Sequence, residues 1–294
     1  MIENQKVHLV LASGGARGIA HIGVIERLEA AGNEIVEVAG CSMGAVVGGL
    51  YAAGKLKEYT EWLLELQRTD VFRQMDFTLA RHGFVKGEKI FSTIMNLIGP
   101  QKIENLKVPF TAVATDLKTG EEVVFKKGDL YQAMRASVSI PGIFTPVSYE
   151  DKQGHLLVDG GVVNPLPLNQ VKAPEGHVVL AVDINATGPK PAIMKKDEDE
   201  QDRSWLNINL NFFKSNSGNQ DPGLMDIISA SYEHMQNQLI LRDLATYKPE
   251  YLIRIPRSTC GVFDFHMAED LIEVGRKAYD EQIVESNEAQ SFAS

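Results

Sequence analysis

The sequence predicts an α/β protein with a mainly parallel central sheet, and two observations carry this prediction. In the first half of the chain, short runs of β-branched residues alternate with longer amphipathic segments, the pattern of strand–helix–strand units. Two glycine-rich corners, "SGGARG" at 13–18 and "GCSMG" at 40–44, each follow an apolar run and precede a helical segment. The carboxyl ends of neighbouring parallel strands lie at one edge of a sheet, where open α/β folds bind ligands. We therefore expect both corners to face one site.

The first predicted elements follow in order along the chain. A buried strand is expected at 7–12, followed by a helix at 17–31 whose isoleucines recur three residues apart and which ends at a Gly-Asn pair. A second strand is expected at 35–39 and a second helix at 43–53, closed by Gly54. These segments supply the two strand-to-helix corners.

Covering helices and further strands make up the rest of the chain. The segment 55–106 has apolar residues on one face of each helical stretch, and an amphipathic helix is expected at 264–283. Another helix is expected at 129–137, ending before Pro141. Further strands are expected at the apolar runs "PFTAVATDL", "EEVVFKK", "HLLVDG", "HVVLAVDI" and "EYLIRI".

Composition and charge restrict the class of protein. The 294 residues are 44% hydrophobic, which is enough to bury a sizeable core, and 29 Lys and Arg stand against 39 Asp and Glu. The net charge of -10 disfavours nucleic acid and anionic membranes as partners through bulk electrostatics. Cys41 and Cys260 form neither a disulfide framework nor a zinc site. With no signal peptide or membrane-spanning segment expected, the sequence predicts a cytoplasmic protein, with peripheral membrane contact left open.

Ser42 stands between Gly40 and Gly44 at the second corner. A Gly-x-Ser-x-Gly corner lifts the serine oxygen clear of the sheet, so we interpret Ser42 as a nucleophile. The alternative is a tight turn with a small polar residue. An oxyanion formed by attack on a carbonyl needs fixed donors, which backbone N–H groups at a helix N-terminus supply. The donors expected here belong to Gly14, Gly15, Ala16 and Met43.

The first corner has an alternative interpretation as a dinucleotide-binding fingerprint. Aligning Gly15 and Gly18 with the second and third glycines of that fingerprint puts Ser13 where the first should stand. The second strand also ends at Gly40 rather than at an acidic residue that could hold a ribose. The sequence therefore disfavours a nucleotide cofactor.

A serine nucleophile needs a base, and Asp159 is the better candidate for it. It ends an apolar strand and precedes Gly160 and Gly161, so its carboxylate is expected to emerge at a sheet edge. The alternative is a hairpin turn, because Asp-Gly is a common turn dipeptide. The histidines offer no motif, and each alone is more often structural or solvated; they are His8, His21, His82, His155, His177, His234 and His266.

Four stretches together resemble the patatin-like phospholipases, nearest to their bacterial and neuropathy-target-esterase-like branch. They are "SGGARGIAHIGVIERLEAAG", "GCSMGAVVGGLYAAG", "RASVSIPGIFTPV" and "VDGGVVNPLP", within a match from about 7 to about 183. "FDFHMAEDLIEVG" is similar to the family's C-terminal helix. The resemblance implies a three-layer α/β/α fold and a serine acyl hydrolase that uses a Ser–Asp dyad without histidine.

The resemblance also assigns roles to single residues. Ser42 matches the nucleophile, Asp159 the dyad aspartate, Gly14 and Gly15 the oxyanion glycines, and Arg17 the basic residue of the glycine-rich loop. The chain departs from the family at the first glycine of that loop, which is a serine here. An ordinary α/β-hydrolase is disfavoured, because it places its nucleophile after several strands and here only two precede it.

We therefore predict hydrolysis of a lipid or carboxylic ester through Ser42 and Asp159, with no metal or cofactor. The apolar residues of 55–106, with Phe144 and Val147, are candidates for an acyl groove or plain core. An acyltransferase and a non-catalytic lipid-binding regulator are the alternatives, and the substrate and oligomeric state are left open. The expected organisation is one domain over 1–294: a core at about 7–185, a mobile excursion at about 186–223 and a helical cover at about 224–285.

Overall fold

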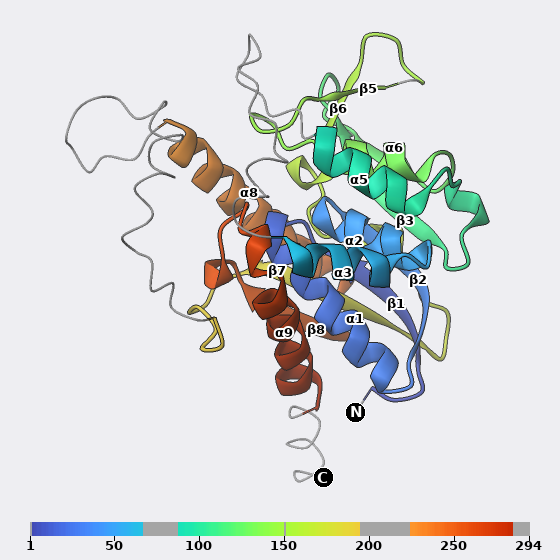
Figure 1. The fold of residues 1–294 in the computed structure, drawn as a ribbon, viewed down its shortest axis with the longest axis vertical. Helices are drawn as coiled ribbons and strands as arrows, with labels where there is room; N and C mark the ends of the chain where they lie inside the picture. The colour runs from blue at the N-terminus through green and yellow to red at the C-terminus, as the bar shows by residue number, and fades with distance from the viewer. Residues whose placement is uncertain (1, 67–87, 150, 195–223, 285–294) are drawn as a thin grey trace, which may run out of the picture.

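One sheet organises the molecule. The computed structural model describes residues 2–66, 88–149, 151–194 and 224–284, and within these ranges the sheet has eight strands (Figure 1). The strands are β1 (Lys6–Leu11), β2 (Glu34–Cys41), β3 (Phe110–Asp116), β4 (Glu122–Phe125), β5 (Val147–Ser148), β6 (Leu156–Asp159), β7 (His177–Ala186) and β8 (Tyr251–Pro256).

The centre of the sheet is parallel and one side of it is antiparallel. Each strand pairs with the next in the series β5-β6-β3-β2-β1-β7-β8, and β4 also pairs with β3. Strands β3, β2, β1, β7 and β8 run parallel, whereas β4 and β6 pair antiparallel with β3, and β5 pairs antiparallel with β6. The predicted mainly parallel sheet is thus confirmed. The chain reverses its direction of progress across the sheet at β1, which makes the carboxyl end of β1 a topological switch point.

Helices cover both faces of this sheet. They are α1 (Ala20–Ala30), α2 (Met43–Ala52), α3 (Leu56–Glu65), α5 (Glu88–Ile98), α6 (Leu130–Ser137), α8 (Leu224–Tyr247) and α9 (Ala268–Tyr279). Figure 1 shows α1, α2, α3 and α9 on the near side of the strands. Helix α8 connects β7 to β8 and packs against β7. The right-handed rule for parallel crossovers places it on the face opposite α1, which completes the three layers.

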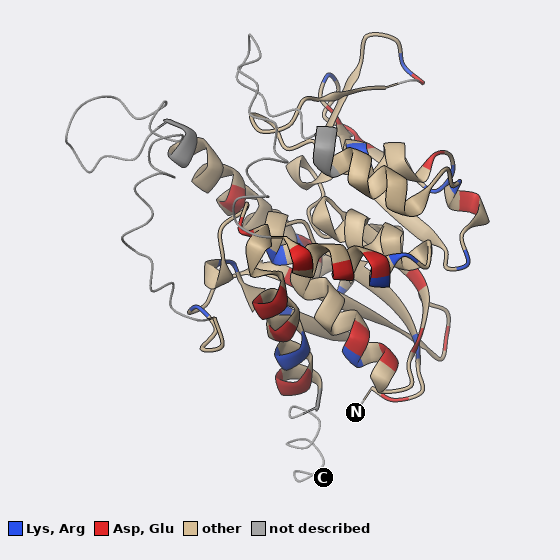
Figure 2. Cartoon of the chain, viewed as in Figure 1, with Lys and Arg blue, Asp and Glu red and all other residues tan. Residues whose placement is uncertain are grey.

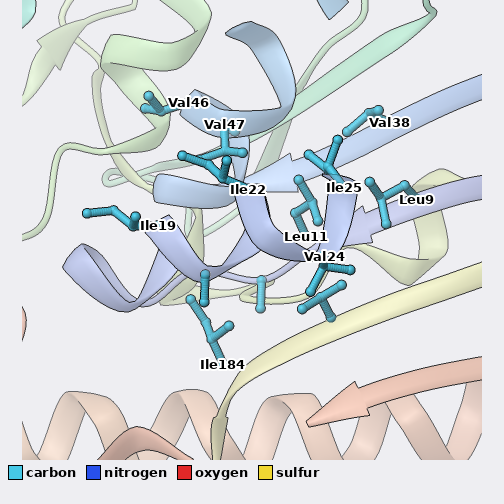
Figure 3. Packing of buried hydrophobic residues seen from close by; sticks show 14 of the residues in the cluster. Leu9, Leu11, Ile19, Ile22, Val24, Ile25, Val38, Val46, Val47 and Ile184 are labelled. Atoms are coloured by element: carbon cyan, nitrogen blue, oxygen red, sulfur yellow. The ribbon is translucent and has the colours of Figure 1, made fainter. Parts of the chain in front are cut away.

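Helices α1 and α9 approach each other closely on the near side of the sheet. A side chain at Gly23 would collide with the carbonyl of Ile272, and one at Gly275 with the carbonyl of Ala20. The core beneath them is formed by Leu, Ile and Val of α1, α2 and the central strands (Figure 3). These contacts fix the start of α1, and with it the first glycine-rich corner.

The structure differs from the predicted elements in several places. The helix expected at 17–31 begins as a 3-10 turn, Gly15–Ile19, before α1. The helix expected at 264–283 is a 3-10 turn, then α9, then a π turn. Strand β5 was not predicted, because two residues carry no periodicity. The excursion expected at 186–223 overlaps the end of β7, and its residues 195–223 lie outside the described residues.

Candidate active site

Ser42 occupies a strained corner between β2 and α2. Its φ of 53° and ψ of -122° are rare for a residue with a side chain, and such a conformation costs on the order of 1–3 kcal/mol. A Cβ at Gly40 would collide with the carbonyl of Gly44, and one at Gly44 with the carbonyl of Leu11. Both flanking positions therefore require glycine, and the strain itself points to a function for Ser42.

Two hydrogen bonds anchor this corner to β3. The Ser42 N–H donates to Ser137 Oγ at 2.8 Å, and the Ser137 hydroxyl donates to the Val113 carbonyl at 2.7 Å. The Ser42 carbonyl accepts from the N–H of Ala45 and of Val46 at the start of α2. The backbone on both sides of the serine oxygen is thus fixed.

Strands β2 and β6 meet end to end along one edge of β3. Cys41, the last residue of β2, pairs with Val113, and Asp159, the last residue of β6, pairs with Ala114. Strand β4 pairs with both halves of β3, so it must occupy the opposite edge. Because β2 runs parallel and β6 antiparallel to β3, their carboxyl ends point at each other. This juxtaposition brings Ser42 and Asp159 together from distant parts of the sequence.

The Asp159 carboxyl group is buried, with 1% of the residue exposed. Its Oδ1 accepts from the Gly161 N–H at 2.7 Å and lies 3.8 Å from Cys41 Sγ. Burial raises its pKa from 3.8 to about 6, against the opposing effect of the Ser42 hydroxyl, the Gly161 N–H and other donors. A carboxylate with a raised pKa is a stronger base than a free one.

Ser42 and Asp159 are close but do not form a hydrogen bond of good geometry. Asp159 Oδ2 has no hydrogen-bond partner among the described residues, although the Ser42 hydroxyl is near enough to lower the carboxyl pKa. Hydrogen bonds between catalytic groups are often loose before substrate binds. The unpartnered oxygen is free to accept a proton from the serine.

His21 packs behind the first corner rather than serving the nucleophile. It is fully buried, and its Nε2 lies 3.0 Å from the Ala12 carbonyl at the end of β1. Burial lowers its pKa to about 4, so the ring is neutral at pH 7. Its place agrees with the packing role that the sequence favoured for it.

The first corner lies beside Ser42 and holds two amides with no acceptor assigned. Gly15 has a φ of 59°, and among the described residues no acceptor contacts the N–H groups of Gly14 and Gly15. The Ala16 N–H instead donates to the Val262 carbonyl at 2.9 Å. Ala16 therefore has no free amide to offer an oxyanion, and we omit it from the proposed donors. Met43 is the first residue of α2 and directly follows Ser42, so its N–H stays among the expected donors.

Hydrogen bonds to β7 and to the loop after Asp159 fix the backbone of Ser13. Its N–H donates to the Pro165 carbonyl at 2.9 Å, and its carbonyl accepts from Asn185 Nδ2 at 2.6 Å. Gly18 packs against the Met43 side chain, where a Cβ would collide. Gly160 likewise meets the Val113 carbonyl. The glycines that the resemblance singled out thus serve close backbone approaches.

Arg17 is buried and ties the first corner to α8. Its guanidinium donates to Glu233 Oε1 at 3.0 Å and to Asn185 Oδ1 at 3.4 Å. The other end of the guanidinium donates to the carbonyls of Arg257 and Cys260 at 3.2 and 3.3 Å. The positive charge of Arg17 is therefore balanced by Glu233 and by acceptors within the protein.

Two cavities meet at Ser42 and Gly15. One is a narrow apolar cavity of ≈ 60 Å³ between α2, α3 and α5, and we call it the apolar cavity. The other, which we call the open cavity, has ≈ 290 Å³ and is lined by the first corner, Asp159 and α8. The apolar cavity is lined by Gly15, Ser42, Met43, Val46, Tyr59, Trp62, Leu63, Leu66, Phe91, Ile94, Val138, Ile140, Phe144, Val262, Phe263 and Phe265.

The apolar cavity uses part of the set proposed as an acyl groove. Phe144 lines it, together with residues of α3 and α5 from the 55–106 segment. Val147 does not, because it lies on β5 and packs against a separate small cluster around Leu157. Residues of one helical segment thus divide between cavity wall and core.

Several residues of the site were not predicted from the sequence. Cys41 contacts Asp159 Oδ1, and Ser137 anchors Ser42. Tyr232, Glu233 and Gln236 reach the site from α8. Ser137 lies within a stretch that carries the family resemblance, which is a usable signal. The α8 residues carry no such signal in the sequence, because the helix lies some 190 residues further along the chain than Ser42.

Within the described ranges, no group of three or more His, Cys, Asp and Glu side chains is arranged to hold a metal ion. Metal independence stays a prediction. A search of the same ranges for a helix long and apolar enough to cross a membrane finds none.

Comparison with known proteins identifies the family. Residues 9–172 match the family model described as "Patatin-like phospholipase". An uncharacterized NTE family protein of Mycobacterium bovis is 34% identical, covering 92% of this chain and 89% of its own, and one from Mycobacterium tuberculosis gives the same values. Patatin-like phospholipase domain-containing protein 6 of Homo sapiens is 33% identical over 63% of this chain and 14% of its own. Among solved structures, VipD from Legionella pneumophila has a TM-score of 0.48 at 13% identity, covering 95% of this chain and 67% of its own.

The three-layer α/β fold carries a serine at a strained corner beside a buried aspartate. The family match covers more than half of the chain, and the chain belongs to the patatin-like phospholipase family. Membership of this family supports lipid hydrolase activity.

Proposed function

We propose that this protein hydrolyses a lipid carboxylic ester through a Ser42–Asp159 dyad and an acyl-enzyme intermediate. Ser42 Oγ attacks the ester carbonyl carbon while Asp159 takes the serine proton. The tetrahedral oxyanion accepts hydrogen bonds from the N–H groups of Gly14, Gly15 and Met43. Collapse breaks the bond to the alcohol oxygen, which leaves with the proton from Asp159. Water then attacks the acyl-enzyme with Asp159 again as base, releasing the carboxylic acid and Ser42.

The single observation that carries this proposal is the end-to-end meeting of β2 and β6. It places a strained serine and a buried carboxyl group side by side, with the carboxyl pKa near 6. A base with this pKa is largely ionised at pH 7 and still accepts a proton readily. No histidine is needed in such a mechanism.

The two cavities support a lipid ester as substrate. The apolar cavity begins at Ser42 and is lined by aromatic and aliphatic side chains, which suits an acyl chain. The open cavity lies on the Asp159 side and carries serine, tyrosine and glutamine side chains, which suit the alcohol part of an ester. The same space admits an acceptor alcohol instead of water, so product analysis with and without added alcohol tests the acyltransferase alternative.

A fluorophosphonate ester probe tests the proposed nucleophile. Mass mapping of the labelled peptide is expected to find the probe on Ser42, and Ser42→Ala should abolish both labelling and ester hydrolysis. Ser148→Ala, at an exposed serine of β5, is the matched control. Asp159→Asn should reduce turnover on the order of a hundredfold or more, as loss of a general base does. Labelling at another serine, or full turnover in folded Ser42→Ala, would contradict the proposal.

The same mechanism requires no metal ion. Protein treated with a chelator is therefore expected to hydrolyse esters at the untreated rate. Activity that is lost on chelation and restored by one particular metal would count against the mechanism.

We further propose that the protein meets its lipid at a membrane surface through apolar residues at the mouth of the open cavity. Ile227 and Ile228 on α8 are 49% and 46% exposed and line this cavity with Pro141. Figure 2 shows charged residues along α1, α3 and α9, and also on the part of α8 that follows these isoleucines. With a net charge of -10, a zwitterionic surface suits the protein better than an anionic one.

Sedimentation with phosphatidylcholine vesicles tests this contact. The double change Ile227→Glu and Ile228→Glu should reduce the bound fraction, whereas Leu156→Glu, at an exposed position of β6, should not. If the double variant and Leu156→Glu bind the vesicles equally, Ile227 and Ile228 do not contact the membrane.

A further inference from the structure

The inward side chains of α8 are polar where the helix covers the site, whereas further along the helix Ile240 is buried in the apolar core. Gln236 and Asn237 are 4% and 8% exposed, whereas Met235 is 59% exposed. An amphipathic helix normally places its apolar residues inward. The part of α8 over the site departs from this pattern, which indicates that its buried polar residues serve the groups that they face.

Tyr232 is the residue of this face that reaches Asp159. A Cβ built on Gly161 would stand 3.1 Å from Tyr232 Oη and 2.9 Å from Asp159 Oδ1, so both oxygens lie beside the same point in space. The Tyr232 hydroxyl is buried and makes no hydrogen bond of good geometry within the part of the chain that the structure describes. A buried hydroxyl without a partner costs free energy unless it serves a nearby group. Gln236 is the other polar group beside it.

We propose that Tyr232 is a positioning residue for Asp159: its O–H donates to the carboxylate and holds it toward Ser42. This inference rests on the proposed function, since it assigns Asp159 as the base. Tyr232 is not itself the base, because burial and the neighbouring Asp159 charge raise the pKa of its hydroxyl well above 10. It therefore stays protonated and acts only as a donor at neutral pH.

The donor has a definite effect on the base. Burial alone favours the neutral acid, whereas a hydrogen bond from Tyr232 favours the carboxylate and lowers the pKa of Asp159. Among the described residues, the other ionisable groups that face this point are Cys41 on β2 and the Arg17–Glu233 ion pair. Cys41 remains a neutral thiol because burial raises its pKa, and Glu122 on β4 acts on it in the same direction. Tyr232 is thus a neutral donor on α8 that lowers the pKa of the base.

Tyr232→Phe removes the hydroxyl and keeps the ring. The acid limb of the kcat profile is expected to move to higher pH by about one to two units, as loss of one hydrogen bond to a charged group does. The fold loss of kcat should be largest below pH 6 and smallest at alkaline pH, with KM little changed. Tyr247→Phe, at an exposed tyrosine near the end of the same helix, is the control. An unmoved acid limb in a folded variant would overturn the proposal.

A titration that needs no catalysis separates this inference from the proposed function. In a Ser42→Ala background, ¹³C-carboxyl NMR of labelled aspartates, with Asp159 assigned by Asp159→Asn, should show a higher Asp159 pKa when Tyr232→Phe is added. An unchanged pKa overturns the Tyr232 role. A raised Asp159 pKa would support the contact between Tyr232 and Asp159 even if Ser42 of the wild-type protein never reacts with the fluorophosphonate. That combination would reject the proposed hydrolase and retain the role of Tyr232.

A third measurement covers a phenylalanine variant that fails to fold. In the wild-type protein with ¹³Cζ-labelled tyrosine, the Tyr232 resonance is expected to move as Asp159 titrates, because the two groups share a hydrogen bond. A Tyr232 resonance that shows no inflection at the Asp159 transition would overturn the proposal.

Discussion

The Arg17 guanidinium lies 3.0 Å from Glu233 Oε1, and this ion pair joins the first glycine-rich corner to α8. The Arg17 side chain is 4% exposed and that of Glu233 27%. Two elements that flank the site from opposite ends of the sequence are thereby held in one arrangement. The pair also neutralises the charge that burial of Arg17 would otherwise leave beside Ser42.

Arg17→Gln is expected to destabilise the protein by about 1–3 kcal/mol, because it leaves a partly buried carboxylate without its partner. Turnover should fall as well, since the oxyanion donors lose their support. Urea denaturation measures the first effect. Arg242→Gln, which removes an exposed guanidinium from its pair with Asp243 on α8, should change stability by less than about 1 kcal/mol. Equal stability of the two variants would show that the Arg17 pair contributes nothing.

The titration of Asp159 opposes folding as pH rises. Its pKa of about 6 in the folded protein lies above the ordinary 3.8. The protonated carboxyl group therefore contributes fully to folding stability below about pH 4, and this contribution is lost as pH rises through 6. The shift corresponds to about 3 kcal/mol. Asp159→Asn lacks this titration, so its stability relative to the wild type should increase between pH 4 and pH 8. Urea denaturation at both pH values checks this, and a constant difference would contradict it.

His21 titrates over the same interval with the opposite sign. Its pKa of about 4 lies below the ordinary 6.5, so its contribution to stability is complete above pH 6.5 and is lost as pH falls through 4. In the wild type the two contributions nearly cancel. His21→Gln should therefore become less stable relative to the wild type as pH rises from 4 to 7, measured by the same unfolding experiment. Its turnover at pH 8 should stay far above that of Asp159→Asn, and equal inactivity of the two folded variants would reopen a histidine mechanism.

Filling the apolar cavity should change the preferred acyl length. Ile94 lines this cavity on α5, whereas the adjacent Met95 is 45% exposed. Ile94→Phe is expected to lower kcat/KM for dodecanoyl esters by about tenfold or more, as lost space for a few methylenes does, and to leave butyryl esters nearly unaffected. Met95→Phe is the control. An equal loss of kcat/KM for both esters would indicate that the acyl chain does not bind in the apolar cavity.

The sequence predicted the order of the central elements because each carries a local signal. The strand–helix corners at Ser13 and Ser42 and the strand ending at Asp159 appear in the structure where the patterns placed them. The end-to-end meeting of β2 and β6 could not be predicted, because it depends on register along β3. Tyr232 could not be predicted either, since its role depends on which groups α8 covers in the folded protein.

The occupied Ala16 amide illustrates a further limit of the sequence. A run of small residues predicts backbone donors, but only the fold shows which of them the protein uses itself. The acceptor, the Val262 carbonyl, lies about 250 residues away in sequence. No local pattern carries that information.

The position of Asp159 on β6 has a consequence for how activity is lost. Strand β6 is four residues long, and its outer neighbour β5 has only two, so this margin of the sheet is held by few backbone hydrogen bonds. Such margins open at lower free energy than central strands such as β1. Amide hydrogens of Leu157 and Asp159 should therefore exchange with deuterium sooner than those of β1. Mild denaturant should inactivate the enzyme while the helices, seen by far-ultraviolet circular dichroism, are still folded.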